Sequence, residues 1–224
     1  MKKSIPLLFA LTALALSSCT STPAEVVINT PAEAISALKA GNARFASEKL
    51  RNPHSSRERR LETTDHQHPF AAIVTCSDSR VPAELIFDEG IGDMFIIRVA
   101  GNIVNSDVVM GSVDYAIDHL GVKVVVVLGH ENCGGVTSAI TVDEHTTHHA
   151  HKGSIGDLIE AIQEDVKPYI GKPESLCEAI HYNTKNQVKR IMDVEYISKK
   201  VAAGEVKIVG AYYDLHTGVV TFNE

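Results

Sequence analysis

Three side chains of different chemistry alternate over a short stretch of the chain, Cys76, Asp78 and Arg80. A strand here would place a thiol, a carboxylate and a guanidinium on one face, because successive side chains point to opposite faces. A packed core gives little reason for that arrangement. A reaction centre does, because an arginine two residues away can keep an aspartate ionised through a charge-assisted hydrogen bond.

His130 and Cys133, in the segment GHENCGG, are further candidate ligands. Cys76 and His130 each stand at the end of a predicted buried strand, so both should emerge at the carboxyl edge of a parallel sheet, where open α/β folds bind ligands. Two sulfurs and one nitrogen suit zinc and leave a fourth position for water. On these residues alone, a structural zinc site or cysteines that merely fill the core remain alternatives.

The pattern along the chain predicts a single α/β domain with a central, mostly parallel sheet flanked by helices. Apolar β-branched runs predict strands, and the valine-rich third run predicts burial on both faces. The strands are expected at 70–75, 94–100 and 122–128, with two more around a turn at 216–218. Helices are expected over 30–50, 106–120, 154–169 and 173–203, and a loop with a short helix over 51–68.

The composition limits the possible partners. The chain has 224 residues, 44% of them hydrophobic, which is enough for one substantial core. It carries a formal net charge of −7 and no tryptophan. The negative charge argues against nucleic acid or an anionic membrane surface as a partner.

The N-terminal segment 1–18 resembles the signal peptide of a bacterial lipoprotein. Two lysines precede an apolar run that is too short to span a bilayer, and the segment ends in LSSC at Cys19. We expect Cys19 to be lipidated, 19–30 to form a tether, and the protein to be anchored on the periplasmic side of a bacterial membrane. An ordinary secretory signal, which would leave the protein soluble in the periplasm, is the alternative.

The cysteine count also favours a metal site. With Cys19 acylated, three cysteines remain, and an odd number is a poor framework for disulfides. Two thiols on a metal, with Cys177 as a buried thiol, would account for all three.

CSDSRVP followed by GHENCGG resembles the β class of carbonic anhydrases. GNARF at 41–45, RVAGN at 98–102 and YDLHTG at 213–218 are also similar to that family, so 31–224 is expected to form its domain. The resemblance implies one Zn²⁺ per subunit, held by the ligands Cys76, His130 and Cys133. It also implies a catalytic dyad, Asp78 and Arg80, that orients zinc-bound hydroxide for the reversible hydration of carbon dioxide to bicarbonate and a proton.

The same resemblance implies a substrate pocket and an assembly. Gln67, Phe95 and Tyr115 match the pocket of the plant-like members, and Gly134 falls where the family brings backbone close to the substrate. Ile73 stands where members that close their site, with the aspartate on zinc, have tryptophan, so an open site is expected. The N-terminal helix is expected to pack on a partner subunit, in a homodimer or an assembly of dimers.

Two other functions remain open on the sequence. Hydrolases of carbonyl sulfide or carbon disulfide keep the same zinc and dyad residues. An envelope zinc-binding protein is suggested by the histidine-rich segment 145–151, with His145, His148, His149 and His151, although a solvated loop accounts for it more simply. The presence of both Asp78 and Arg80 counts against a protein that only stores zinc, because zinc storage needs no catalytic dyad.

Overall fold

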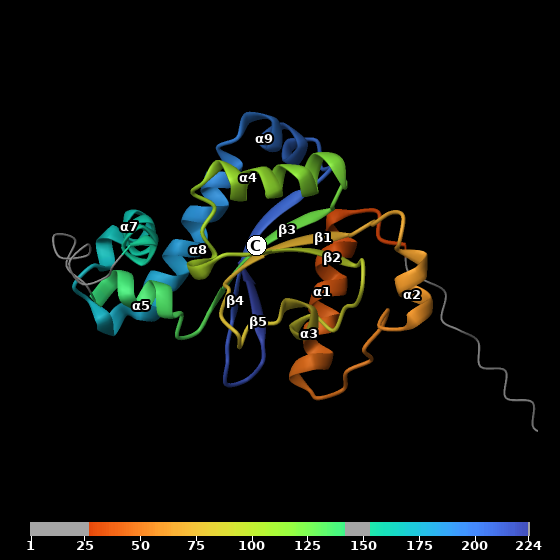
Figure 1. The fold of residues 1–224 in the computed structure, drawn as a ribbon, viewed down its shortest axis with the longest axis horizontal. Coiled ribbons are helices and arrows are strands. Elements are labelled where there is room, and N and C mark those ends of the chain that lie inside the picture. The colour runs from red at the N-terminus through yellow and green to blue at the C-terminus, as the bar shows by residue number, and fades with distance from the viewer. Residues whose placement is uncertain (1–26, 142–152, 224) are drawn as a thin grey trace, which may run out of the picture.

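The computed structural model describes residues 27–141 and 153–223. Their core is one five-stranded sheet of order β2-β1-β3-β4-β5 (Figure 1). The strands are β1 (Ala71–Thr75), β2 (Met94–Arg98), β3 (Val124–His130), β4 (Lys207–Tyr213) and β5 (Val220–Asn223). All neighbouring strands are parallel except β4 and β5, which pair antiparallel. The mostly parallel sheet expected from the sequence is confirmed.

The helices lie around this sheet, and most match the predicted ranges. They are α1 (Pro31–Ala46), α2 (Arg57–Glu62), α3 (Ala83–Ile86), α4 (Asp107–Asp114), α5 (Gly134–Thr141), α7 (Ser154–Val166), α8 (Leu176–Met192) and α9 (Glu195–Ala202). Single turns occur at η1 (Ala100–Asn102), η2 (Tyr115–His119), η3 (Lys167–Tyr169) and η4 (Pro173–Ser175).

Helix α1 begins where its sequence signals indicate. The hydroxyl of Thr30 accepts a hydrogen bond from the Glu33 amide at 3.2 Å, and the Glu33 carboxylate accepts one from the Thr30 amide at 2.9 Å. This reciprocal pair satisfies two amides that the first turn of a helix leaves unpaired. The helix ends at Ala46, a few residues before the predicted end.

Helices cover both faces of the sheet (Figure 1). On one face, α1 and α3 pack on alternate residues of the strands, including Ile73, Val126 and Leu128. On the other, α4 and α9 cover the intervening set, including Val125 and Val127. Every residue of β3 is buried, as its unbroken apolar run predicts for a central parallel strand.

Helices α5, α7 and the first half of α8 form a third cluster beyond the carboxyl ends of the strands, around Cys76 and Cys133. The helical character expected over 173–203 is confirmed, as η4, α8 and α9, and the helices break at Val194, whose backbone is extended (φ −76°, ψ 113°). The break turns α9 onto the sheet, where Ile191 and Ile197 join the same core. Propensity alone does not reveal such a break.

Within 27–141 and 153–223, no helix is long and apolar enough to cross a membrane. The predicted signal peptide (1–18), Cys19 with most of the tether, and the histidine-rich segment 145–151 lie outside the described residues.

Candidate metal centre

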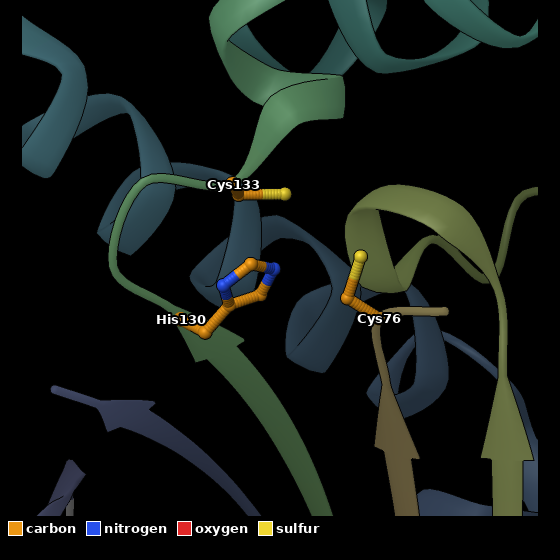
Figure 2. Close-up of side chains that lie close together, drawn as sticks. All are labelled: Cys76, His130 and Cys133. Atoms are coloured by element: carbon orange, nitrogen blue, oxygen red, sulfur yellow. The ribbon is translucent and has the colours of Figure 1, made fainter. Parts of the chain in front are cut away.

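Parallel pairing brings the predicted metal ligands together. Strands β1 and β3 are neighbours, with Thr75 opposite Leu128, so Cys76 and His130 emerge at the same edge of the sheet. Cys133 follows a turn at Asn132, whose left-handed backbone (φ 52°) returns the chain toward His130. The ligand atoms of all three side chains lie within 4.8 Å of one another and are buried. Figure 2 shows the two sulfurs and the imidazole converging on one space.

The imidazole of His130 is prepared to bind a cation. Its Nδ1 lies 2.9 Å from the carbonyl oxygen of Glu131, so Nδ1 is the protonated nitrogen. Its Nε2 is buried and has no hydrogen-bond partner among the described residues. A buried polar atom without a partner is costly. A metal bound at Nε2 would remove that cost. In metal-bound histidines the other ring nitrogen usually donates a hydrogen bond, as Nδ1 does here.

The two thiols interact strongly with each other. A hydrogen bond from Cys133 lowers the pKa of Cys76, whereas the pKa of Cys133 is raised by the same contact and by burial. Without a metal the pair therefore retains one proton, because two buried thiolates would repel each other. A divalent cation would displace that proton and neutralise both sulfurs. The donor set and its protonation fit zinc.

Asp78 and Arg80 form a bidentate ion pair beside the ligands. Arg80 Nε lies 2.9 Å from Asp78 Oδ1, and Arg80 Nη2 lies 2.7 Å from Oδ2. This pairing lowers the pKa of Asp78 to about 2, so the carboxylate is ionised at neutral pH. Asp78 Oδ2 lies 3.9 Å from His130 Nε2, which puts a proton acceptor next to the candidate metal position.

Three hydrogen bonds from two residues, Arg98 and Gly101, support this loop and were not recognised in the sequence. Arg98, at the end of β2, donates to the carbonyl oxygens of Cys76 at 3.2 Å and of Asp78 at 2.6 Å. The Gly101 amide donates to the sulfur of Cys76 at 3.4 Å. Arg98 and Gly101 both lie in the segment RVAGN, which the family resemblance had marked. That resemblance did not indicate which groups the two residues contact.

The residues predicted to line the substrate pocket, Gln67, Phe95 and Tyr115, lie away from the candidate metal ligands of the same chain. Gln67 and Tyr115 line an open groove that also includes Ile91 and His119. The ring of Phe95 lies 5.9 Å from that of Tyr115. Phe95 pairs with Ala72, well back from the strand ends that carry the ligands. The structure thus gathers Gln67, Phe95 and Tyr115, but not at the ligands of their own chain.

Gly134 is the first residue of α5 and directly follows the candidate ligand Cys133. A Cβ added at Gly134 would have no atom within 4 Å, so the backbone there borders open space.

A second group of metal-binding side chains lies close to the site. Glu131, Asp214 and His216 have ligand atoms within 4.8 Å of one another. However, Asp214 accepts from the amides of His216 and Thr217, and Glu131 accepts from Leu215 and His216. Both carboxylates are thus occupied in holding the turn after β4.

Cys177 is exposed, so the prediction of a buried thiol is wrong. It lies in the first turn of α8, whose buried face begins at Ala179.

The sequence model of the carbonic anhydrase family matches residues 71–220. Carbonic anhydrase 2 of Mycobacterium tuberculosis is 35% identical over 192 residues, which cover 84% of this chain and 90% of that protein. The carbonic anhydrase of Mycolicibacterium smegmatis is 35% identical over 195 residues, with 85% and 92% covered.

Solved structures agree on the fold. A Coccomyxa β-carbonic anhydrase in complex with acetazolamide superposes with a TM-score of 0.65 at 24% identity, covering 84% of this chain and 85% of that one. One of two tetrameric β-carbonic anhydrases from Sordaria macrospora gives 0.63 at 24% identity, covering 84% and 95%. This chain therefore belongs to the carbonic anhydrase family, and the enzyme class expected from the motifs is confirmed. Its fold is that of the solved β-carbonic anhydrases.

Proposed function

We propose that this enzyme catalyses the zinc-dependent, reversible hydration of carbon dioxide to bicarbonate and a proton. The observation that carries the proposal is the bare, buried Nε2 of His130, which faces two thiols and lies 3.9 Å from an ionised carboxylate. Cys76, His130 and Cys133 would hold one zinc ion. Zinc, when bound, lowers the pKa of a coordinated water, so that hydroxide is available near neutral pH.

Asp78 and Arg80 have separate tasks in this reaction. The attacking oxygen must present a lone pair to the carbon of carbon dioxide, so its remaining proton needs an acceptor. Ionised Asp78 supplies one, and its two hydrogen bonds from Arg80 keep it charged and aimed. Arg80 also donates to the carbonyl of Asn132 at 3.2 Å, which ties the dyad to the turn between the ligands.

We assign the enzyme to the open-site subtype, in which Asp78 stays off the metal at rest. The bidentate pairing with Arg80 supports this assignment, and Ile73, buried in the core, has no ring N–H to offer a regulatory anion. A zinc-loaded structure at about pH 7.5 tests it. We expect a fourth ligand from solvent, whereas an Asp78 oxygen at ~2.0–2.2 Å from zinc would contradict the assignment.

The substrate pocket is completed by a second subunit in this proposal. Gln67, Phe95 and Tyr115 gather in one region away from the ligands of their own chain, so they would serve the metal site of a partner. There Gln67 would donate to a bicarbonate oxygen, and the two rings would form an apolar wall for carbon dioxide. Gly134 would bring its backbone close to the substrate.

Stopped-flow measurement of carbon dioxide hydration tests the main proposal. We expect turnover in the protein as purified, one zinc per subunit by elemental analysis, loss of turnover on chelation and recovery with added zinc. Full turnover in protein that contains no metal would contradict the proposal. The same samples, assayed for hydrogen sulfide release from carbonyl sulfide and carbon disulfide, separate the hydrolase alternative. Zinc binding without hydration of carbon dioxide and without hydrolysis of carbonyl sulfide or carbon disulfide would favour the alternative of an envelope zinc-binding protein.

We further propose that the enzyme is exported and lipid-anchored through Cys19. The signal-like segment that ends in LSSC supports this placement. Metabolic labelling with a fatty-acid analogue is expected to label the wild-type protein and not Cys19→Ser. Unlabelled, processed wild-type protein in the periplasm would instead indicate an ordinary secretory signal.

A further inference from the structure

The backbone at Gly101 is built tightly against a candidate metal ligand. Its amide donates to the sulfur of Cys76 at 3.4 Å. Gly101 adopts left-handed backbone (φ +70°), and a Cβ added there would lie 2.7 Å from the Cδ1 of Ile162. The left-handed backbone favours glycine, and an added Cβ would force the end of the Ile162 side chain to move. The close approach of this peptide to the sulfur therefore depends on what holds Gly101 in place.

The carbonyl group of the same residue is held by a buried side chain of α8. Asn183 Nδ2 donates to the Gly101 oxygen at 2.8 Å, and Asn183 is 0% exposed. Asn183 Oδ1 accepts from Gln187 Nε2 at 3.0 Å. Gln187 donates to the oxygen of the Asn183 side-chain amide, and the nitrogen of that amide donates to Gly101. These two hydrogen bonds fix the orientation of the Asn183 side chain.

Gln187 anchors Asn183 to the rest of the molecule. Also 0% exposed, it donates to Asp165 Oδ2 at 2.6 Å and accepts from the Val104 amide at 2.9 Å. Asp165 pairs with Arg190 at 2.7 Å, at the edge of the network. A continuous run of hydrogen bonds thus leads from α7 and α8, through Gly101, to the sulfur of Cys76.

We propose that Asn183 is a positioning residue of the metal centre: by holding the carbonyl of Gly101, it keeps the Gly101 amide on the sulfur of Cys76 and limits electron donation from that sulfur to the metal. This inference rests on the zinc site of the proposed function. A hydrogen bond to a thiolate withdraws electron density from it, and such outer contacts tune a bound metal. Two thiolates already cancel the formal charge of Zn²⁺, so weaker donation keeps the metal acidic enough for catalysis.

The test uses the full chain loaded with Co²⁺, whose thiolate-to-metal charge-transfer absorption reports the energy of the sulfur lone pairs. In Asn183→Leu we expect this band to move to longer wavelength, because a sulfur without its hydrogen bond gives up an electron more easily. We also expect the zinc affinity to fall about 10-fold, as for other outer contacts of metal sites.

Gln163→Met is the matched control. Gln163 is also buried, and its Nε2 donates to a backbone carbonyl, that of Ala139, at 3.0 Å. Losing this amide should cost comparable stability, but the band should stay where it is in the wild type. An unshifted band in Asn183→Leu, or an equal shift in both variants, would overturn the proposal.

If Asn183→Leu does not fold, Gln187→Met takes its place, since it leaves Asn183 present but without its anchor. We then expect a smaller shift in the same direction, and an unshifted band would overturn the inference. The two proposals fail differently. A wild-type protein that binds neither Zn²⁺ nor Co²⁺ would contradict the proposed function, whereas an active, metal-loaded wild type with unshifted variants contradicts only the role of Asn183.

Discussion

At the scale of single residues, the proposed reaction depends on the charge state of Asp78. Its two hydrogen bonds from Arg80 lower its pKa to about 2, so it stays an anion over the pH range in which the enzyme would work. Substrate carbon dioxide carries no charge of its own. In the proposed reaction, the Asp78–Arg80 pair would therefore act as a proton acceptor aimed at the attacking oxygen, and not as an anchor for the substrate.

Asp78→Asn should lower carbon dioxide hydration by about 100-fold or more while zinc stays bound, because the amide keeps the size of the carboxylate but removes its charge. Stopped-flow kinetics and elemental analysis of the same sample measure both quantities. Asp193→Asn, an exposed aspartate at the end of α8, is the control and should be neutral. Near-normal turnover in Asp78→Asn would show that the role assigned to Asp78 is wrong.

Glu89 provides a pH-dependent prediction about stability. Burial, with a further contribution from nearby Asp93, raises its pKa to about 7 despite the partly opposing charge of Arg44. The native state therefore holds this proton between about pH 4.5 and pH 7, where the unfolded chain has already lost it. By linkage, the contribution of Glu89 to the free energy of unfolding falls as pH rises through this window, and stays low above it.

Glu89→Gln should accordingly be more stable than the wild type at pH 8, by about 1 kcal/mol after allowance for solvent screening, and no more stable at pH 4. Urea unfolding at the two pH values measures the difference. Glu62→Gln, at an exposed glutamate, serves as the control. A gain of equal size at both pH values would rule out this linkage.

At the scale of elements, one buried side chain of α1 joins three segments that are distant in sequence. Asn42 donates to the carbonyls of Ile86 at 3.2 Å and Gly218 at 2.9 Å, and accepts from the Val220 amide at 2.8 Å. It therefore connects α1 to the end of α3 and to the turn that begins β5. Its position in GNARF gives no local indication of these contacts.

Asn42→Leu should lower the free energy of unfolding by about 2–4 kcal/mol, because it leaves buried backbone groups without partners. Denaturant unfolding followed by far-ultraviolet circular dichroism measures the change. Ser36→Ala, on an exposed position of the same helix, should change it by less than about 0.5 kcal/mol. A loss for Asn42→Leu no larger than that of the control would mean that solvent replaces these bonds.

At the scale of the whole molecule, we expect a homodimer or a larger assembly of dimers. The expectation follows from the separation of the predicted pocket residues from the candidate ligands of their own chain. Sedimentation velocity at micromolar concentration measures the mass in solution. An active monomer would contradict both the assembly and the shared pocket.

Much of the fold, and the convergence of the candidate ligands, was predictable because both depend on local or periodic signals. The capping box at Thr30 and Glu33 and the valine run of β3 are readable in isolation. The strand ends of a parallel sheet meet at one edge, so the sequence alone predicts that Cys76 and His130 lie close together. Two cysteines and one histidine at this edge of the sheet were then enough to suggest a zinc site.

The tertiary structure alone decided the contacts that no periodicity encodes. Asn183 and Gly101 meet because α8 crosses the end of the sheet, and an asparagine on a helix looks the same in sequence whether it is solvated or buried. The break at Val194 and the exposure of Cys177 likewise depend on which surface each helix buries. Local sequence determines most of the elements and which candidate ligands they carry, whereas packing between distant segments determines where a helix breaks and which polar groups surround the candidate ligands.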